Sequence, residues 1–399
     1  MSKNKYNLDS CTTCNTCNIN CPVMAVSDKF YGPKMSGPAG ERLRLFEDYK
    51  DETEYESLKY CSNCKNCDIS CPSMVPISTL NMIARARYEE TKTRSLEEWI
   101  LAHTEKMGEL SSIMPSIANL GMRLPFNGMF LDKSGLAKNA PFPKYASKSF
   151  EKLFKSINQK NFSNKIVFYP GCFINYNEPH IGLDVVKVLN ANGYEVILPE
   201  DTACCGSPLV TGGYLKEAEE NAVKNVNSLS RYIEKGYKVI TACTTCLLMF
   251  SVEILELFEV KNSDKLAENI YDVFEFLREL LEQGNLNTNF KPIKGEYLYH
   301  APCHLRAKGI GKPVLDVFSV FDELKVIDLN TACCGVSGNY GFKKSNFDIS
   351  LAIGESLFKD IKERKINTVL SDCGPCRLQI GKFAEVKTMH PISLFAQAY

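Results

Sequence analysis

Cysteine constrains this chain more than any other residue, because all 18 of its cysteines belong to two internal repeats. The shorter repeat, CTTCNTCNINCP, begins at Cys11 and returns as CSNCKNCDISCP at Cys61, with each Cys and the closing Pro in register. The longer repeat consists of one Cys, then a Cys-Cys-Gly, then a C-x-x-C. Its two copies contain Cys172, Cys204, Cys205, Cys243 and Cys246, and then Cys303, Cys333, Cys334, Cys373 and Cys376.

The rest of the sequence favours metal binding over disulfides. The N-terminal residues lack the charged-then-apolar run of a secretory signal, so we expect a reducing cytoplasmic location, where disulfides are rare. The 47 basic side chains balance the 47 acidic ones, which removes any composition argument for a nucleic-acid binder. The best candidate for a membrane span, Ile113 to Phe130, contains Pro115, Arg123 and Pro125, so we expect none.

Each long repeat predicts a parallel α/β unit with its cysteines at strand ends. The β-branched and aromatic runs KIVFYP, EVILP and KVITA each lead into a cysteine cluster, as do EYLYHAP, KVIDLN and NTVLSD in the second copy. Apolar residues at helical spacing lie between these runs, for example Ala222, Val226 and Leu229. Open parallel sheets hold their ligands at the carboxyl ends of strands.

The fold class predicted for the whole chain is mixed, α+β and α/β, with a helical N-terminal domain before two Rossmann-like units. We predict a helical domain over residues 1–132, a basic linker over 133–164, a first cysteine-rich unit over 165–290 and a second over 291–399. Between Lys133 and Lys165, eight Lys against Glu151 alone give a local charge of +7. Such a segment favours an anionic membrane surface, and solvation of a linker or contact with an acidic partner is the alternative.

The short repeat has the C-x-x-C-x-x-C-x-x-x-C-P spacing of two-cluster ferredoxins, in which the fourth Cys reaches the neighbouring [4Fe–4S] cube. The 39 residues between Cys21 and Cys61 exceed the gap of a compact ferredoxin and favour a helical variant. Two four-cysteine zinc sites are the alternative. The predicted cubane ligand sets are Cys11, Cys14, Cys17 and Cys71 for one cluster, and Cys61, Cys64, Cys67 and Cys21 for the other.

Five cysteines in each long repeat exceed the four that a cubane or a zinc ion needs. We expect an irregular cluster with a bridging thiolate, which uses all five. Zinc bound by four of the five is one alternative, and a redox-active C-x-x-C thiol pair is another.

Several motifs carry a resemblance to known families. The Cys-Cys-Gly pairs resemble those of the CCG domains of the heterodisulfide reductase family, which hold non-cubane [4Fe–4S] clusters. The motifs GERLRL from Gly40, GCFINYNEP from Gly171, YHAPCH from Tyr299, GNYGFKK from Gly338 and HPISLFAQA from His390 add a narrower match. Together they closely resemble the family of anaerobic glycerol-3-phosphate dehydrogenase C subunits, over essentially the whole chain.

This resemblance implies an iron–sulfur subunit with two cubane and two non-cubane clusters, peripheral on the inner face of the cell membrane. Such a subunit passes electrons from a flavin-containing dehydrogenase partner towards quinone. The chain has neither a P-loop nor a G-x-G-x-x-G, so we expect the flavin on the partner. Two alternatives remain: a protein that itself reduces a disulfide at its CCG clusters, and a zinc-stabilised membrane-anchoring scaffold.

Three histidines lie in informative positions. His300 and His304 flank Cys303, where they would tune a cluster through hydrogen bonds to its sulfurs or move protons with electrons. An ordinary packed, hydrogen-bonded role is the alternative. His390 precedes Pro391 at an expected helix start, which predicts a capping role.

Overall fold

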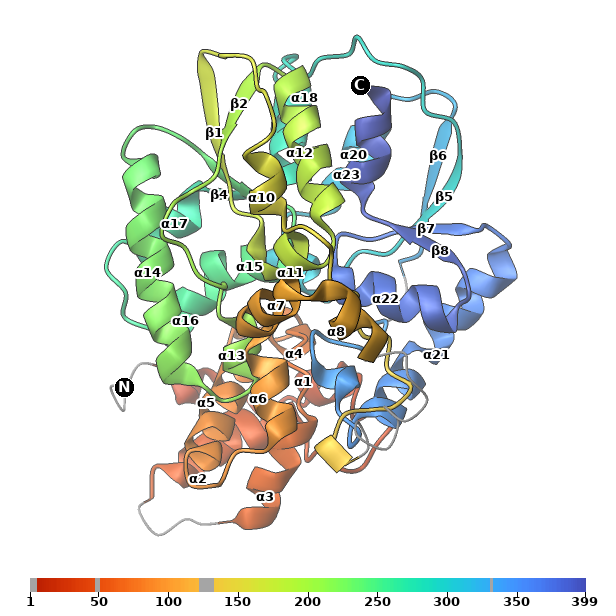
Figure 1. Ribbon diagram of the computed structural model, residues 1–399. Coiled ribbons are helices and arrows are strands. Elements are labelled where there is room, and N and C mark those ends of the chain that lie inside the picture. Colours follow the sequence, from red (N-terminus) through yellow and green to blue (C-terminus); the bar gives the residue numbers. More distant parts are fainter. Residues whose placement is uncertain (1–5, 47–50, 122–132, 331–332) are drawn as a thin grey trace.

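The computed structural model describes residues 6–46, 51–121, 133–330 and 333–399 (Figure 1). The N-terminal region is helical, and no strand occurs among its described residues up to 121. A short helix begins inside each copy of the short repeat, and a longer, almost entirely buried helix follows the second copy. The helices are α1 (Thr16–Ile19), α2 (Gly40–Arg44), α3 (Glu52–Ser57), α4 (Asn66–Ile69), α5 (Ile77–Glu89), α6 (Leu96–Ala102), α7 (Thr104–Ile113) and α8 (Pro115–Gly121).

Each long repeat forms a four-stranded parallel sheet, and the two sheets have equivalent strand orders, β2-β1-β3-β4 and β6-β5-β7-β8. We call residues 165–290 the first CCG unit and residues 291–399 the second CCG unit. The strands are β1 (Asn164–Phe168), β2 (Tyr194–Ile197), β3 (Val239–Thr241) and β4 (Ile270–Asp272), then β5 (Gly295–Tyr299), β6 (Leu324–Asp328), β7 (Thr368–Leu370) and β8 (Lys387–Met389).

Helices connect these strands and cover the sheets. The residues predicted at helical spacing, Ala222 to Leu229, lie on α14 and are buried. The helices of the first unit and the segment before it are α10 (Phe150–Phe154), α11 (Gly171–Tyr176), α12 (Pro179–Ala191), α13 (Ser207–Thr211), α14 (Leu215–Ile233), α15 (Thr244–Leu248), α16 (Ile254–Leu257), α17 (Ser263–Asn269) and α18 (Val273–Glu282). Those of the second are α19 (Cys303–Lys308), α20 (Pro313–Phe318), α21 (Phe347–Arg364), α22 (Gly374–Phe383) and α23 (Pro391–Phe395).

The predicted fold class is confirmed, since a helical N-terminal region precedes two α/β units with parallel sheets. Six of the eight strands lie in the six predicted runs. Strands β4 and β8 were not predicted, because each has three residues, IYD and KTM, and neither belongs to a longer β-branched run.

A shared hydrophobic core joins the two CCG units. Phe274 on α18 of the first unit packs against Phe318 on α20 and Phe395 on α23 of the second, with ring centroids 5.7 and 6.1 Å apart. All three rings are buried in one cluster. Burial of each such ring stabilises the fold by roughly 1.5–3 kcal/mol, so the units pack as one body. The N-terminal helices lie along one side of this body (Figure 1).

The segment predicted as a linker packs on both CCG units. Ala137 donates its backbone N–H to the carbonyl of Phe342 in the second unit at 2.8 Å. Phe150, at the start of α10, is buried in the core of the first unit. The boundaries 133–164 stay a prediction.

Exposed apolar side chains on the last turn of α7 and along α8 form one apolar surface. Asn119 on α8 fixes this surface to the basic segment, because its amide exchanges hydrogen bonds of 2.8 and 2.9 Å with the backbone of Tyr145. Among the described helices, none combines the length and the apolar character needed to cross a membrane. The large apolar side chains exposed here are Leu110, Ile113, Met114, Ile117 and Leu120.

Candidate metal centres

The two copies of the short repeat lie against each other through α1 and α4. Cys17 interacts electrostatically with Cys11 and Cys71, and Cys21 does so with Cys61. The fourth cysteine of each copy therefore lies beside cysteines of the other copy, in the arrangement of the predicted ligand sets.

The two sets differ in their exposure to solvent. Cys14 in the first set is exposed, and hydrogen bonding to Thr16 lowers the pKa of its thiol. All four cysteines of the second set are buried. Burial raises the pKa of Cys64 to about 12 and that of Cys21 to about 11. Only the first set therefore offers a cysteine that an outside partner can approach.

In the first CCG unit, the ends of three strands bring five cysteines together. The Sγ atoms of Cys172 and Cys204 are 3.9 Å apart. Helix α7 of the N-terminal region closes this site, because Thr104 Oγ1 lies 3.4 Å from Cys172 Sγ and Glu105 accepts the backbone N–H of Cys204 at 2.9 Å. The remaining members, Cys205, Cys243 and Cys246, interact with one another through their thiols.

In the second CCG unit, the same strand ends carry the equivalent cysteines. The Sγ atoms of Cys334 and Cys376 are 3.2 Å apart, and the N–H of Gly335 donates to Cys333 Sγ at 3.3 Å. A ring nitrogen of His300 lies within 4.8 Å of the sulfurs of Cys334 and Cys376. Burial lowers the pKa of His300 to about 4, so its ring is neutral at pH 7 and retains a free lone pair. The other two cysteines of this site are Cys303 and Cys373.

The CCG sites fit a metal centre bound by thiolates. Gly171 has a φ of +68°, and a Cβ there would lie 2.8 Å from Cys246 Sγ, so a side chain at this position would intrude on the site. Hydrogen bonding to neighbouring cysteines, together with burial, raises the pKa of both Cys172 and Cys376. Several buried thiols cannot ionise together without a nearby positive charge, and a cationic metal core supplies it.

The second cubane set adjoins the second CCG unit. Cys64 interacts electrostatically with Cys303 and Cys333. Ser337, shortly after the Cys-Cys-Gly, donates its hydroxyl to the carbonyl of Ser62 at 2.6 Å. Two of the predicted cofactor sites therefore lie side by side although their cysteines are far apart in the sequence.

His304 connects three of the sites. Its Nδ1 lies 3.0 Å from Thr245 Oγ1, between the two cysteines of the C-x-x-C in the first CCG unit. Its Nε2 lies 3.4 Å from the carbonyl of Asn63, inside the second copy of the short repeat. Both ring nitrogens are thus occupied by protein partners, which is the packed, hydrogen-bonded role that we gave as the alternative for this residue.

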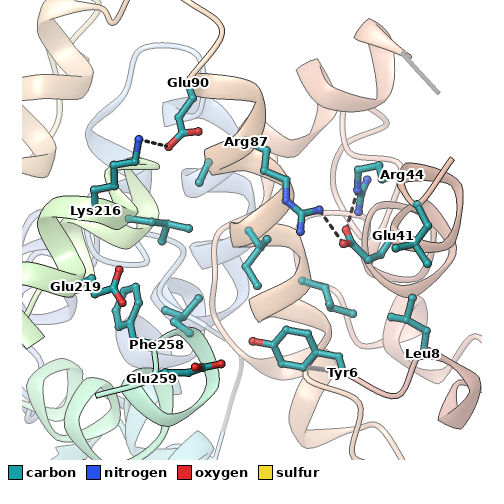
Figure 2. A pocket seen from close by; sticks show the side chains of 16 residues that line it. Tyr6, Leu8, Glu41, Arg44, Arg87, Glu90, Lys216, Glu219, Phe258 and Glu259 are labelled. Atoms are coloured by element: carbon teal, nitrogen blue, oxygen red, sulfur yellow. Dashed lines mark hydrogen bonds and ion pairs between the residues drawn. The ribbon is translucent and has the colours of Figure 1, made fainter. Parts of the chain in front are cut away.

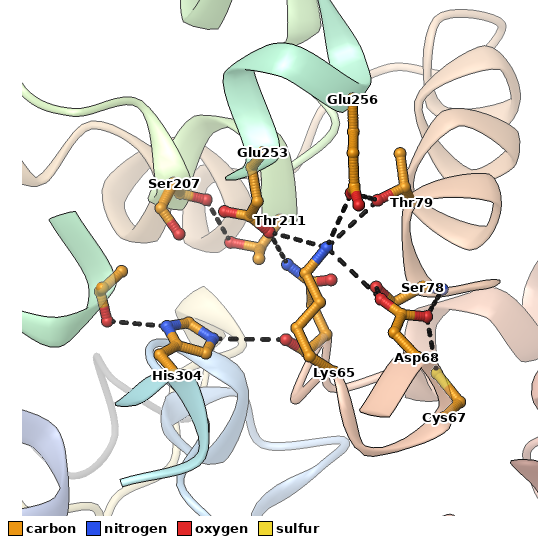
Figure 3. A network of polar contacts seen from close by, with 12 residues as sticks. Lys65, Cys67, Asp68, Ser78, Thr79, Ser207, Thr211, Glu253, Glu256 and His304 are labelled. Carbon is orange, nitrogen blue, oxygen red and sulfur yellow. Dashed lines mark hydrogen bonds and ion pairs between the residues drawn. The ribbon is translucent and has the colours of Figure 1, made fainter. Parts of the chain in front are cut away.

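A buried charged network lies beside the second cubane set (Figure 3). Lys65, inside the C-x-x-C-x-x-C, places its Nζ 3.2 Å from Glu253, 3.5 Å from Glu256 and 3.7 Å from Asp68. The Lys65 and Glu253 side chains are only 4% and 1% exposed. Burial acts to lower the pKa of Lys65, but attraction to Glu253, Asp68 and Glu256 outweighs it and raises that pKa. This network fixes the N-terminal domain to the first CCG unit.

A cavity of about 770 Å³ opens between the N-terminal region and the first CCG unit (Figure 2). Ion pairs at its edge join Arg87 to Glu41 at 2.7 Å and Lys216 to Glu90 at 3.7 Å. Its wall is partly apolar, and none of its lining residues is a cysteine. The lining residues Tyr6, Leu8 and Leu80 also pack around Cys11, Cys17 and Cys71.

Sequence reasoning identified the capping histidine but missed the residues that surround the cysteines, whose assignment as ligands stays a prediction. His390 caps α23, with its Nδ1 accepting the N–H of Ile392 at 3.1 Å, as predicted. Lys65 and Glu253 were missed, because nothing local links residues so far apart in the sequence. Alignment of the long repeats alone would have paired His300 with Tyr169, since each lies three residues before the first cysteine of its unit.

Family models match both cysteine regions. The model described as a cysteine-rich domain, CCG, matches residues 166–251 and 297–381. The model described as a 4Fe-4S dicluster domain matches residues 7–75. The matches cover the two copies of the long repeat and both copies of the short repeat.

Two curated relatives match almost the whole chain, and a third matches part of it. The C subunit of the anaerobic glycerol-3-phosphate dehydrogenase of Escherichia coli strain K12 is 38% identical over 400 residues, which cover 99% of each chain. The D subunit of the dihydromethanophenazine:CoB–CoM heterodisulfide reductase of Methanosarcina acetivorans is 26% identical, over 98% of this chain and 94% of the relative. The B subunit of the fumarate reductase (CoM/CoB) of Methanothermobacter marburgensis is 27% identical, over 61% of this chain and 48% of the relative.

Proposed function

Because the chain belongs to the family of anaerobic glycerol-3-phosphate dehydrogenase C subunits, we propose that it passes electrons from the flavin of a partner dehydrogenase towards membrane quinone. Its eight N-terminal cysteines would hold two [4Fe–4S] cubanes, and the ten CCG cysteines two non-cubane [4Fe–4S] clusters. When bound, such clusters accept and release single electrons. The observation that carries the proposal is the joining of three cysteine sites around Cys64 and His304.

The chain's own residues keep water away from most of the cysteines and leave one cysteine exposed to a redox partner, as electron transfer requires. The second cubane set and most CCG cysteines are buried, which excludes water from the interior of the route. The first set reaches solvent at Cys14. We therefore infer that the redox partner docks over Cys14.

The ligand sets have a direct test in Cys71→Ser. The spacing predicts that this change damages the cluster of Cys11, Cys14 and Cys17 and spares that of Cys61, Cys64 and Cys67. The electron paramagnetic resonance of the reduced, anaerobic protein reports the loss of one cubane signal. Cys21→Ser is the matched control and should remove the other signal. Loss of the same signal in both variants would contradict the crossed sets.

The electron route is tested by mixing the anaerobic chain with its flavin-containing dehydrogenase subunits and glycerol 3-phosphate. We expect the visible absorbance of the clusters to fall only when partner and substrate are both present. If the chain is not reduced by its partner but reduces a disulfide with an artificial electron donor, the function is the heterodisulfide-reductase-like alternative.

One observation favours that alternative and one opposes it. The heterodisulfide reductase relative aligns with 98% of the chain. However, among the described residues no CCG cysteine lines the cavity of about 770 Å³, and the cavity that the cysteines of the second unit line holds only about 10 Å³, too little for a substrate disulfide. We therefore retain electron transfer as the proposed function.

We further propose that the chain lies on the inner membrane face through the apolar surface of α7 and α8. The first four lysines of the adjoining basic segment are exposed and form no ion pair with a described carboxylate. Each lysine near an anionic leaflet contributes up to about 1 kcal/mol, and the apolar side chains add shallow insertion. The lysines are Lys133, Lys138, Lys144 and Lys148.

Vesicle flotation tests this placement. We expect the purified chain to float at low salt with phosphatidylcholine vesicles that contain phosphatidylglycerol, and to remain behind with phosphatidylcholine alone. Ile113→Asp with Ile117→Asp should weaken flotation, whereas Val223→Asp, at an exposed position on α14, should not. Absence of binding to the anionic vesicles would leave protein partners as the only route to the membrane.

A further inference from the structure

His300 occupies a position at which a side chain must face the second CCG site. It directly follows β5 and lies three residues before Cys303, and its backbone N–H donates to Leu370 of the neighbouring strand at 2.9 Å. This pairing fixes the backbone beside the strand end. The residue is 3% exposed and lines the same cavity as the five cysteines of its unit.

The imidazole of His300 differs from the other buried histidines of the CCG units in its hydrogen bonding. Among the described residues, none forms a hydrogen bond with its ring, in contrast to His304 and His390, whose ring nitrogens all have partners. A buried polar group without a partner costs about 1–3 kcal/mol, so such groups call for an explanation. Its ring shares a cavity with the five cysteine sulfurs, and the charged groups of Arg306 and Asp328 act on it electrostatically from further away.

The distances suit coordination. A ring nitrogen of His300 and the sulfurs of Cys334 and Cys376 all lie within 4.8 Å of one another. Ligands of one tetrahedral ion, with metal–sulfur bonds of about 2.3 Å and metal–nitrogen bonds of about 2.0 Å, are separated by about 3.6–3.8 Å. Small side-chain movements therefore bring all three atoms onto a single metal ion.

The equivalent position in the first CCG unit excludes this role. Tyr169 follows β1 and lies three residues before Cys172, but its hydroxyl donates to the carbonyl of Ala203 at 2.6 Å. Its ring also packs edge-on against Phe250, with centroids 4.9 Å apart. The phenol is thus satisfied by the protein, and among the described residues the first site has no histidine grouped with its cysteine sulfurs.

We propose that His300 is a metal ligand of the second CCG site, which therefore has a mixed nitrogen and sulfur donor set, while the first site is bound by sulfur only. The inference rests on the proposed function in one respect, that the second unit holds a metal centre. His300 would then replace one of the five thiolates assigned to this site, and a neutral imidazole in place of a thiolate makes a cluster easier to reduce, as in Rieske centres. The second site then has a higher reduction potential than the first.

The test is pulsed electron paramagnetic resonance of the anaerobic, iron-loaded full chain with its histidines labelled with ¹⁵N. We expect a strongly coupled histidine nitrogen in the native protein and in His304→Asn. The coupling should disappear in His300→Tyr, which introduces the residue that the sister unit carries naturally. Absence of coupling in the loaded native protein, or its persistence in His300→Tyr, would overturn the proposal.

Metal analysis of the same samples separates this inference from the proposed function. If the second site holds zinc, the electron route fails, and X-ray absorption at the zinc edge then decides the role of His300. One nitrogen among the zinc ligands supports the inference, and a shell of sulfur alone overturns it. If His300→Tyr does not fold, retention of the coupling in His304→Asn shows that His304 is not the coupled histidine. The coupling is then assigned to His300, the histidine that lines the site.

Discussion

The two CCG units have equivalent strand orders and the same cysteine pattern, but their sites lie in different surroundings. In the first unit, β1 is followed by a tyrosine whose hydroxyl donates to the protein, and in the second, β5 is followed by a histidine that lines the cavity of the cysteines. Cysteine spacing thus decides where a metal centre is held. The residues that precede the first cysteine of each unit decide how the surroundings of the two sites differ.

The units also contact the short repeats differently. The second unit places Cys303 and Cys333 near enough to Cys64 to interact with it electrostatically. The first unit is held by the buried charges of Lys65 and Glu253 instead. One contact therefore suits electron exchange, and the other suits mechanical attachment.

The largest effect that we expect from breaking this contrast follows Lys65→Met. The change leaves Glu253 buried without its cation, and removal of one partner of a buried ion pair costs about 3–5 kcal/mol. Asn15→Met, at the matching position of the first copy, is the control and should cost much less. The free energy of unfolding from anaerobic urea titrations at equal iron content gives the comparison. Equal losses in the two variants would contradict the attachment role.

A second, smaller effect separates the glycines of the two Cys-Cys-Gly sequences. Both have positive φ, +93° at Gly206 and +85° at Gly335, so alanine costs about 1–2 kcal/mol at either position. A Cβ at Gly335 would also lie 1.9 Å from the carbonyl oxygen of Ser350, whereas at Gly206 the nearest atom is 3.5 Å away. We expect Gly335→Ala to cost about 1–3 kcal/mol more than Gly206→Ala. Thermal unfolding measures the difference. Similar melting temperatures for the two variants would contradict the expected clash between a Cβ at position 335 and the carbonyl oxygen of Ser350.

The smallest effect concerns a buried contact that the two units make in different ways. Asp272 is the last residue of β4 and caps α18. It lies near Asp372, which follows β7. In the equivalent contact, made by the residues that follow β8 of the second unit and β3 of the first, the Nε2 atom of His390 lies 3.0 Å from the carbonyl oxygen of Ala242. Burial raises the pKa of Asp372 to about 6, and burial together with Asp372 raises the pKa of Asp272.

Raised carboxyl pKa values mean that the folded protein keeps protons that the unfolded chain releases above about pH 4. The stability that these protons supply is present at low pH and is lost as the pH rises through about 6. Asp272→Asn retains the helix cap and removes one carboxylate, so it should gain about 1 kcal/mol over the native protein at pH 8 and nothing at pH 4. Urea titrations at both pH values measure this, and a gain independent of pH would refute it.

The sequence was sufficient for the strands that end on cysteines, because runs such as KIVFYP combine β-branched residues with a following cluster. It was insufficient for β4 and β8, whose three residues form strands only because a neighbouring strand pairs with them. The ion pairs of Lys65 could not be predicted from the sequence either. A lysine inside a cysteine motif suggests an exposed loop, and only the packing of the first CCG unit buries it beside Glu253.

What the two CCG units bind decides whether the chain can carry electrons through them, and metal analysis with Mössbauer spectroscopy of the ⁵⁷Fe-labelled, anaerobically purified chain measures this directly. The account predicts about sixteen iron atoms per chain, four for each of four clusters, with Mössbauer components beyond those of cubanes. About eight iron atoms with cubane components alone, accompanied by about two zinc ions, would contradict it and leave the CCG units as structural domains.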